Sequence, residues 1–388
     1  MECRICQSTN VSKKISYKTP INHNYLLHPE DACKYYQFDI YFCHECGFIY
    51  SPDYIQSKDE LYENYFTLSA WKPQPHTQSI VARIKNFLGT PLDSKIIEVG
   101  CNDGSFLDLL VENGYRNVIG IEPTKDASSA SIKKSHQVIN NFLTSSLVDD
   151  YDLANKFDIV TSRHVIEHII DLDDFLQSCR KMLKPNGVLI LELPDHGEAI
   201  KYLDFSFWEE HVNYFTYETI HNLLQKNGLT IFATESTLFT GTAQIHYIKR
   251  SEPLELEHSA EHLEKAERYL DNFDLFSHNI KNYVQEINAS REIICFGGGC
   301  RLTSLINIFQ LQSEIKCFVD DNIHKVGKFL PMSQLEIQPS SILKGGDYHV
   351  ILGVNGEIEG KIIRRFNLQS YCSFLPPSLN LPNFWTYN

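Results

Sequence analysis

Residues 95–107 read KIIEVGCNDGSFL, and this stretch decides the fold of the central part of the chain. The run KIIEV is short and mostly apolar, which predicts a buried β-strand. Gly100 and Gly104 then permit a tight backbone turn, because glycine adopts positive φ without steric cost. The apolar residues of 106–110 have helical spacing. The stretch therefore predicts a strand, a glycine loop and a helix, as at the start of a nucleotide-binding βαβ unit.

A second strand is predicted at 117–122, NVIGIE, and it ends in an acidic residue. Glu122 lies about 20 residues beyond the glycines, where the acid of such a unit hydrogen-bonds ribose hydroxyls. The glycine loop is G-x-x-x-G, which differs from the G-x-G-x-x-G loop of dinucleotide-binding proteins. This difference disfavours a nicotinamide oxidoreductase. Such an enzyme would otherwise be a candidate, because a second nucleotide-type unit follows in the C-terminal part of the chain.

Further elements follow in the alternating order of an α/β domain. The stretch 157–168, FDIVTSRHVIEH, predicts a strand that runs into a polar loop, in which we interpret His164 as a structural residue. Apolar residues at helical spacing predict a helix over 172–183, which ends at the KPNG breaker of 184–187. Residues 188–193 are predicted to form the next strand.

Taken in this order, E-x-G-x-x-x-G, the acid on the second strand, F-D-x-V and L-K-P-x-G resemble class I S-adenosylmethionine (SAM)-dependent methyltransferases. The resemblance implies an α/β, Rossmann-like domain with SAM as its cofactor. It also implies that Glu122 holds the ribose and that Asn141 and Phe142 hold the adenine. The other residues that it assigns to the SAM pocket are Glu98, Gly100, Asn102 and Gly104.

Two C-x-x-C pairs lie near the N-terminus, and they are formed by Cys3 with Cys6 and by Cys43 with Cys46. Two such pairs together supply the four thiolates of a tetrahedral zinc site. Because four cysteines leave no open position for water, the predicted zinc is structural. Cys33 and His44 are alternative ligands, and a redox dithiol is the competing interpretation of a single pair.

Residues 207–216, FWEEHVNYFT, carry the candidates for acid–base chemistry. Histidine is readily tuned to general-base work, and Glu210 could orient His211 or raise its basicity. The alternative is that these residues form a polar turn beside an aromatic cluster, and the residues alone leave both interpretations open.

The cysteine pairs, E-x-G-x-N-D-G, E-H-x-x-Y-F-T and a second glycine loop occur in this order along nearly the whole chain. This order resembles the zinc-containing, three-domain C-methyltransferases that act on nucleotide-linked deoxy-keto sugars. The resemblance implies that His211 removes the proton next to the ketone, with Glu210 beside it and Tyr65 in the same site. Trp208 stands where the family has a tyrosine, and Tyr214 or Tyr65 could compensate.

The C-terminal part contains a second strand and glycine loop, EIICFGGGCR at 292–301, after one long predicted helix over 259–288. Backbone amides of Gly297 and Gly298 at a helix N-terminus would form an anion site, with Arg301 available for a phosphate. Residues 325–331, which include Lys328, resemble a K-x-G-x-x-x-P turn of the same family. By analogy this domain holds the nucleotide diphosphate of the acceptor; the alternative is a unit that only supports the SAM domain.

The bulk properties of the 388 residues limit the remaining choices. A net charge of −14 without a basic stripe argues against nucleic acid as a partner. No apolar run approaches the roughly 18 residues of a membrane helix, and the N-terminus lacks a signal-peptide pattern. We therefore expect a cytoplasmic, monomeric protein whose substrate is a nucleotide-linked sugar. The predicted domains are a zinc region and connector at 1–75, a SAM domain at 76–250, and a linker helix with a second Rossmann-like domain at 251–388.

Two other function classes remain at this point. An O- or N-methyltransferase of a related nucleotide sugar or small metabolite would explain the loss of the family tyrosine at Trp208. A zinc-ribbon interaction protein could bind nucleotides without catalysis, although the intact glycine loop and Glu122 argue against it.

Overall fold

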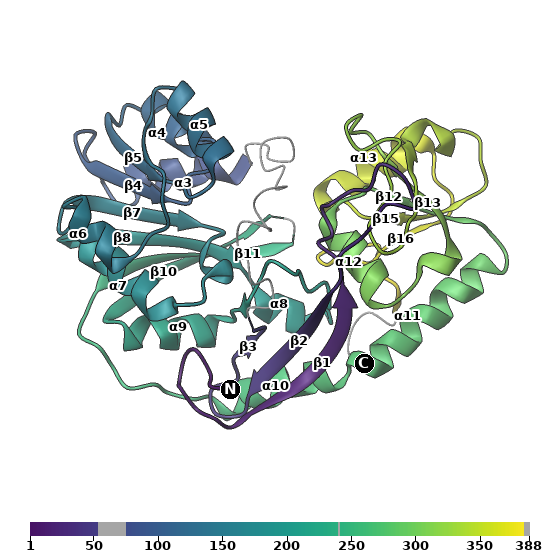
Figure 1. The fold of residues 1–388 in the computed structure, drawn as a ribbon, viewed down its shortest axis with the longest axis horizontal. Helices are drawn as coiled ribbons and strands as arrows, with labels where there is room; N and C mark the ends of the chain where they lie inside the picture. The colour runs from purple at the N-terminus through teal and green to yellow at the C-terminus, as the bar shows by residue number, and fades with distance from the viewer. Residues whose placement is uncertain (53–74, 240, 384–388) are drawn as a thin grey trace. The chain divides into compact units, whose positions relative to one another are not determined.

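The computed structural model describes residues 1–52, 75–239 and 241–383 (Figure 1). The chain divides into two compact units, each made of three segments. The first unit contains Met1–Thr9, Phe66–Asp195 and Asn213–Ser259, and the second contains Asn10–Tyr65, His196–Val212 and Ala260–Asn388. Among the described helices, none combines the length and apolarity that crossing a membrane requires.

The first unit is built on a mixed sheet with the strand order β10-β11-β8-β7-β4-β5-β6. The strands from β8 to β6 in this order are parallel, whereas β11 is antiparallel to both β8 and β10. The bounds are β4 (Lys95–Val99), β5 (Asn117–Ile121), β6 (Gln137–Ile139), β7 (Phe157–Arg163), β8 (Leu183–Pro194), β10 (Leu229–Leu238) and β11 (Thr242–Arg250).

Helices cover both faces of this sheet, with α3, α4 and α5 on one face and α6, α7 and α9 on the other (Figure 1). The change of face accompanies the reversal of strand order between β4 and β7, and such a reversal opens a ligand crevice at the carboxyl ends of the strands. The helices are α3 (Pro75–Asn86), α4 (Ser105–Glu112), α5 (Lys125–Lys133), α6 (Ser145–Asp150), α7 (Leu172–Met182) and α9 (Tyr217–Lys226), with a 3-10 turn at Ile166–His168 and a short strand β9 at Asn213–Tyr214.

The core of the first unit explains why the glycine loop is held firmly. Ile84 of α3, Ile96 of β4 and Leu107 of α4 are completely buried in one apolar cluster. Burying each such side chain contributes about 1.5–3 kcal/mol relative to exposure. The strand and the helix on either side of the loop are therefore anchored by packing, and the loop between them has fixed ends.

The second unit includes antiparallel strands and several helices. The strands are β1 (Val11–Thr19), β2 (Tyr36–Cys43) and β3 (Ile49–Tyr50), and the helices are α8 (His196–Lys201), α10 (Ala260–Asp271) and α11 (Phe273–Asn288). Lys14 of β1 joins this strand to α10, because its Nζ lies 2.8 Å from Glu267 and 2.9 Å from Asp271.

A parallel sheet completes the second unit, with the strand order β14-β13-β12-β15-β16. The order reverses between β12 and β15, so right-handed connections place α12 and α13 on opposite faces of the sheet. The elements are β12 (Ile293–Phe296), α12 (Cys300–Ile308), β13 (Ile315–Asp320), β14 (Ile337–Pro339), β15 (His349–Leu352), α13 (Gly356–Phe366) and β16 (Tyr371–Ser373), with 3-10 turns at Gln312–Glu314 and Ser340–Leu343.

The single helix predicted over 259–288 is wrong, because the structure has two helices that meet at Asn272. The Asn272 side chain donates through Nδ2 to the Arg268 carbonyl oxygen at 2.7 Å. Asparagine competes in this way with regular helical hydrogen bonding, which explains the interruption. The strand predicted at 188–193 also begins earlier, at Leu183.

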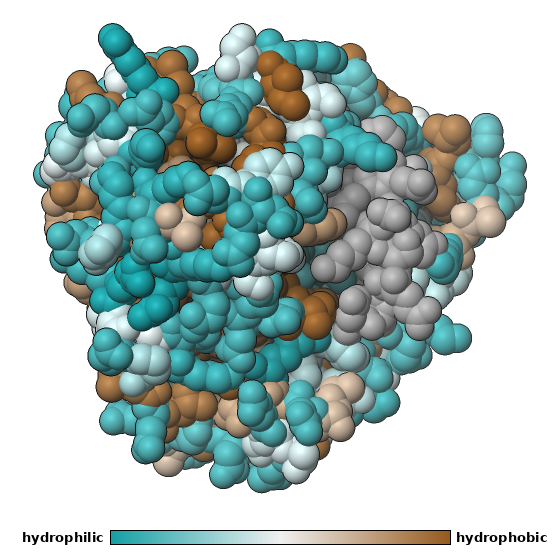
Figure 2. All heavy atoms as spheres, turned by 60° about the vertical axis from the view of Figure 1, so that its left-hand side comes forward, coloured by the Kyte–Doolittle hydropathy of each residue, from teal (hydrophilic) through white to brown (hydrophobic). Residues whose placement is uncertain are grey.

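One face of the surface is mainly hydrophilic. Figure 2 shows a face on which hydrophilic side chains predominate and hydrophobic ones occur in small groups. Scattered apolar side chains of this kind are usual on protein surfaces and do not identify a binding site.

Candidate active site

The glycine loop after β4 has the tight backbone that the sequence predicts. Gly100 has φ 75°, and an added Cβ would lie 2.4 Å from Cγ2 of Val165. Gly104 has φ 77°, and its added Cβ would lie 2.3 Å from Oγ of Ser131. Both positions therefore require glycine for backbone conformation and for space, and the loop passes close to its neighbours.

Glu98 lies at the carboxyl end of β4 with one oxygen available for a ligand. Its Oε1 accepts a hydrogen bond from Nε of Arg163 at 3.1 Å. Its Oε2 is buried and has no hydrogen-bond partner among the described residues, and the same is true of Oδ1 of Asn102. Burial raises the pKa of Glu98 to about 7 despite the nearby Arg163. A buried carboxylate oxygen of this kind suits an ammonium or hydroxyl group of a ligand.

Glu122 follows β5 and forms a hydrogen bond with the glycine loop. Its Oε2 accepts the backbone N–H of Asn102 at 2.9 Å, and its Oε1 accepts the backbone N–H and the hydroxyl of Thr124. Oε2 has a second lone pair, so this arrangement still permits a hydrogen bond from a ribose hydroxyl. Asn141 and Phe142 lie at the surface after β6, with Phe142 40% exposed.

A charged network at the ends of β7 and β8 is absent from the sequence prediction. Oε1 of Glu192 lies 2.6 Å from Nε2 of His76 and 3.2 Å from Nε2 of His164. Nδ1 of His164 lies 3.2 Å from Oε1 of Glu167. Burial lowers the pKa of His164, but the hydrogen bonds that it donates to the two carboxylates outweigh this effect and raise the pKa to about 9. His164 is thus a charged centre of the network, which agrees with its interpretation as a structural residue.

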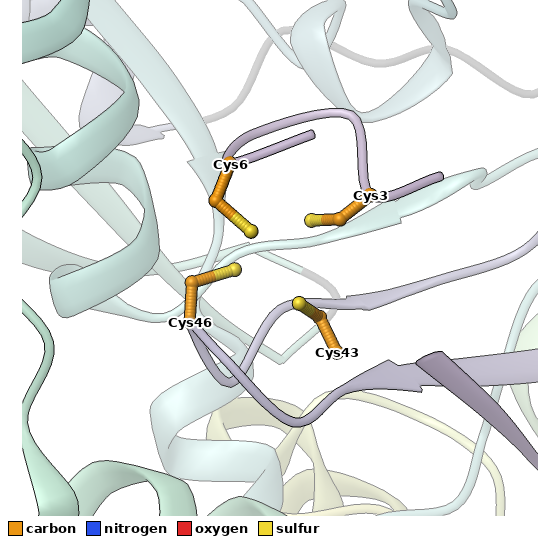
Figure 3. Close-up of side chains that lie close together, drawn as sticks. All are labelled: Cys3, Cys6, Cys43 and Cys46. Atoms are coloured by element: carbon orange, nitrogen blue, oxygen red, sulfur yellow. The ribbon is translucent and has the colours of Figure 1, made fainter. Parts of the chain in front are cut away.

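The four N-terminal cysteines lie together. Figure 3 shows the side chains of Cys3, Cys6, Cys43 and Cys46 pointing toward one another, and their Sγ atoms all lie within 4.8 Å of each other. Around a zinc ion with Zn–S bonds of about 2.3 Å, tetrahedral sulfurs would be about 3.8 Å apart. Each pair sits on a tight turn: the N–H of Gln7 donates to the carbonyl of Cys3, and that of Gly47 to the carbonyl of Cys43.

The loop that contains the Glu-Glu-His run has a partner that the sequence does not reveal. Oε1 of Glu210 lies 2.8 Å from Nδ1 of His23, in the connection between β1 and β2. Glu209 accepts hydrogen bonds from the backbone N–H of Asn22 and from its Nδ2, the latter at 2.8 Å. Burial, and then the charge of Glu210, raise the pKa of Glu209 to about 7. An Asn-His pair in the connection between β1 and β2 carries no sequence signal for such contacts.

The other predicted catalytic residues are placed as follows. His211 is half-buried. Its backbone N–H donates to the carbonyl of Trp208 at 2.9 Å, and the centroids of the two side-chain rings lie 5.0 Å apart. Tyr214 belongs to β9 and is 7% exposed. Tyr65 lies outside the described residues.

The glycine loop of the second unit lies at the carboxyl end of β12, beside the reversal of strand order. Gly297 has φ 97°, and the N–H of Gly298 donates to Oδ2 of Asp320 at 3.0 Å. Lys325 lies nearby, with its Nζ 3.2 Å from the Gly298 carbonyl oxygen. Lys328 is partly exposed in the turn before β14. A crevice at a reversal of strand order is the usual ligand position in open α/β sheets.

Arg301 of α12 makes several contacts within the second unit. Its guanidinium forms an ion pair with Asp204 and donates to the carbonyl of Pro376 at 2.6 Å. Its Nε donates to Oγ of Ser206 at 3.2 Å. Arg301 therefore holds the segment that leads into the Glu-Glu-His run.

Two protein families match successive parts of the chain. The family described as a methyltransferase domain matches residues 74–234. The family described as a C-methyltransferase C-terminal domain matches residues 229–365. Together with the α/β fold of the first unit and its glycine loop, these matches confirm the predicted enzyme class. The chain is a SAM-dependent methyltransferase.

Individual relatives carry the comparison further. C-methyltransferase NovU of Streptomyces niveus is 22% identical over 382 residues, which cover 91% of this chain and 90% of NovU. The human mitochondrial ubiquinone biosynthesis O-methyltransferase is 28% identical over 54% of this chain and 56% of its own length. A solved 1,6-didemethyltoxoflavin-N1-methyltransferase of Burkholderia thailandensis is 14% identical, with a TM-score of 0.40, over 53% of this chain and 96% of its own. NovU and the C-terminal match support a C-methyltransferase family.

Proposed function

We propose that this enzyme methylates a carbon atom of a nucleotide-linked deoxy-keto sugar, by base-assisted enolisation followed by in-line methyl transfer. The observation that carries the proposal is the similarity to C-methyltransferase NovU, which extends over 91% of the chain and so includes both units. The match of residues 229–365 to a C-methyltransferase C-terminal domain supports it independently of the SAM-binding part.

SAM would supply an electrophilic methyl group together with its own leaving group. The residues of the first unit fit this cofactor. The free oxygen of Glu98 would accept from its ammonium group, and Glu122 would accept from the ribose hydroxyls. Gly100 and Gly104 let the backbone pass close to the ligand, with Asn102 between them. Asn141 and Phe142, exposed after β6, are the residues we propose for the adenine.

His211 would remove the proton next to the ketone of the acceptor. A carbon acid needs a base with a pKa near neutrality and a donor for the developing enolate oxygen. Tyr214 and Tyr65 are proposed for that donor role, because Trp208 can donate a hydrogen bond but cannot shuttle a proton. Glu210, the residue before His211, would orient this base or raise its basicity.

The second unit would hold the nucleotide diphosphate of the acceptor. The backbone amides that follow Gly297 and Gly298 at the start of α12 favour an anion, and Lys328 would add positive charge. Arg301 would act through its ion pair with Asp204, which orients the segment before the Glu-Glu-His run. The proposed zinc at Cys3, Cys6, Cys43 and Cys46 would be structural, since four thiolates complete its coordination.

The test is incubation of the enzyme in D2O with SAM and a panel of nucleotide-linked 4-keto deoxysugars, followed by mass spectrometry. We expect deuterium uptake next to the ketone and a methyl adduct on carbon. Both should fall by roughly 100-fold or more in His211→Ala, the usual contribution of a general base. Methyl transfer that is indifferent to His211 would favour an O- or N-methyltransferase, which the loss of the family tyrosine at Trp208 also accommodates.

A further inference from the structure

The N-terminal turn of residues 3–6 is attached to the rest of the first unit at two points. Nη1 of Arg4 donates to Oδ1 of Asn213 at 3.0 Å. The carbonyl oxygen of Ile5 accepts from Nζ of Lys226, on α9, at 3.1 Å, and the Ile5 side chain is completely buried. Both residues between the two cysteines of this turn therefore contact the methyltransferase domain.

Asn213 extends this connection to the loop that follows β7. Its Nδ2 donates to the carbonyl oxygen of Ile166 at 3.1 Å and to that of Ile169 at 2.6 Å. These two carbonyls lie at either end of the 3-10 turn Ile166–His168. Because Asn213 is only 2% exposed, water cannot readily replace these hydrogen bonds. One buried amide thus joins the N-terminal turn to the 3-10 turn.

The 3-10 turn in its turn contacts the proposed SAM pocket. Val165, directly before it, packs against Gly100, since a Cβ added to this glycine would lie 2.4 Å from Cγ2 of Val165. Glu167, within the turn, has its Oε1 3.2 Å from Nδ1 of His164. A displacement of the 3-10 turn would therefore disturb both the glycine loop and the charged network at the ends of β7 and β8.

We propose that Asn213 is a positioning residue for SAM binding, and that it couples the turn of residues 3–6 to the glycine loop through the 3-10 turn Ile166–His168. Its side-chain amide suits this role, because it accepts from one turn through oxygen and donates to the other through nitrogen. Without this amide the loop adopts the SAM-binding conformation for a smaller fraction of the time, and the apparent affinity falls in proportion. The inference rests on the SAM pocket of the proposed function and is independent of the acceptor.

The first test measures SAM binding rather than methyl transfer, because Tyr214, next to Asn213, is a candidate for the acceptor site. Calorimetric titration of the full chain with SAM should give a Kd at least about tenfold higher in Asn213→Ala than in wild type. The matched control is Asn227→Ala. Asn227 lies in the same unit and is 3% exposed, but its side chain bonds to residues of α7 and α9. This control should leave the affinity for SAM unchanged.

Two results of this titration overturn the proposal. One is an unchanged affinity for SAM in folded Asn213→Ala, and the other is an equal loss of affinity in Asn227→Ala, which would show a general structural effect. Glu122→Ala separates these results from a failure of the proposed pocket. If Glu122→Ala weakens SAM binding and Asn213→Ala does not, only the positioning role is wrong. If neither weakens it, the proposed pocket is wrong as well.

The second test uses a milder substitution, which remains informative if Asn213→Ala folds poorly. Arg4 is only partly buried, and Arg4→Gln leaves the bonds of Asn213 to the loop in place. Without SAM, hydrogen–deuterium exchange of residues 163–170 should be roughly threefold faster or more in Arg4→Gln, at equal metal content, and SAM should bind more weakly. Arg116→Gln, at an exposed position before β5, is the control and should change neither. Unchanged exchange and affinity in Arg4→Gln overturn the proposal.

The double variant tests the coupling itself. Once Asn213→Ala has broken the connection, adding Arg4→Gln should cause no further loss of SAM affinity. Losses that add fully in the double variant contradict the coupling, because Arg4 then acts on SAM binding by a route that does not include Asn213.

Discussion

At the scale of single residues, the proposed SAM crevice depends on buried charges that neutralise one another. Glu192 lies at the end of β8 with a side chain that is 0% exposed, between His76 and His164. Burial alone would raise the pKa of Glu192. The two histidines lower the pKa by a larger amount, so that it lies well below its ordinary value. An ion pair of this kind is costly to break, because its removal leaves an uncompensated buried charge.

We expect Glu192→Gln to lower the free energy of unfolding by about 3–5 kcal/mol near neutral pH. The raised pKa of His164, about 9, means that its stabilisation is complete below its ordinary value and is lost as pH rises through about 9. The lowered pKa of Glu192 means that its stabilisation is lost only as pH falls below its ordinary value. Urea unfolding at several pH values should therefore show the largest difference from wild type between about pH 5 and 8.

An exposed pair provides the matched control for this measurement. Asp149 lies 2.5 Å from Lys181, with side chains 64% and 37% exposed. Asp149→Asn should cost no more than about 1 kcal/mol at any pH in the series. A Glu192→Gln difference that stays constant up to pH 10 would contradict the role given to His164.

The residues predicted from the sequence are those whose partners are near in the chain. Glu98 and Glu122 belong to a local strand–loop–helix pattern, and so they could be identified without coordinates. The contact of Glu192 with His76 spans 116 residues, and that of Glu209 with Asn22 spans 187. Contacts over such separations depend on the tertiary fold, and no spacing rule in one sequence predicts them.

At the scale of elements, α12 determines the position of the segment that carries the Glu-Glu-His run. Arg301 pairs with Asp204, and Oγ of Ser304 donates to the carbonyl of Phe207 at 2.5 Å. The segment 202–212 has no regular helix or strand of its own. Its conformation therefore depends on these contacts with α12 as well as on hydrogen bonds within the segment, such as the one from the backbone N–H of His211 to the Trp208 carbonyl.

We expect Arg301→Gln to destabilise the enzyme by about 3 kcal/mol, because the buried Asp204 carboxylate then loses its positively charged partner and keeps only its hydrogen bonds from Ser206. The double variant Arg301→Gln with Asp204→Asn should recover most of that loss, as measured by urea unfolding of the single and double variants. If Arg301 instead binds the diphosphate directly, Arg301→Gln would raise KM for the nucleotide sugar and leave stability unchanged.

Element types were predictable from the sequence, but their interruptions were less so. The apolar period of 259–288 is helical throughout, and it predicts one helix where the structure has two. Periodicity reports which face of a segment is apolar. It does not report that Asn272 bonds back to Arg268 and ends the first helix.

At the scale of the whole molecule, the two units share the same arrangement at the carboxyl ends of their parallel strands. In each, the strand order reverses at the strand that carries the glycine loop. In each, an acid at the carboxyl end of the next strand accepts from a loop amide: Glu122 from Asn102, and Asp320 from Gly298. One chain therefore contains two sheet ends of the type that bind nucleotide-like ligands, as a methyltransferase with a nucleotide-linked acceptor would need.

The four-cysteine group gives the prediction at this scale. We expect about one zinc per chain by mass spectrometric metal analysis, because four thiolates complete a structural site. Cys3→Ser should lose the zinc and lower Tm by at least about 5 °C, since metal binding contributes directly to folding. Cys33→Ser is the matched control, because Cys33 lies outside the group of four. Loss of zinc in Cys33→Ser, or an unchanged Tm in metal-free Cys3→Ser, would refute the structural role of this site.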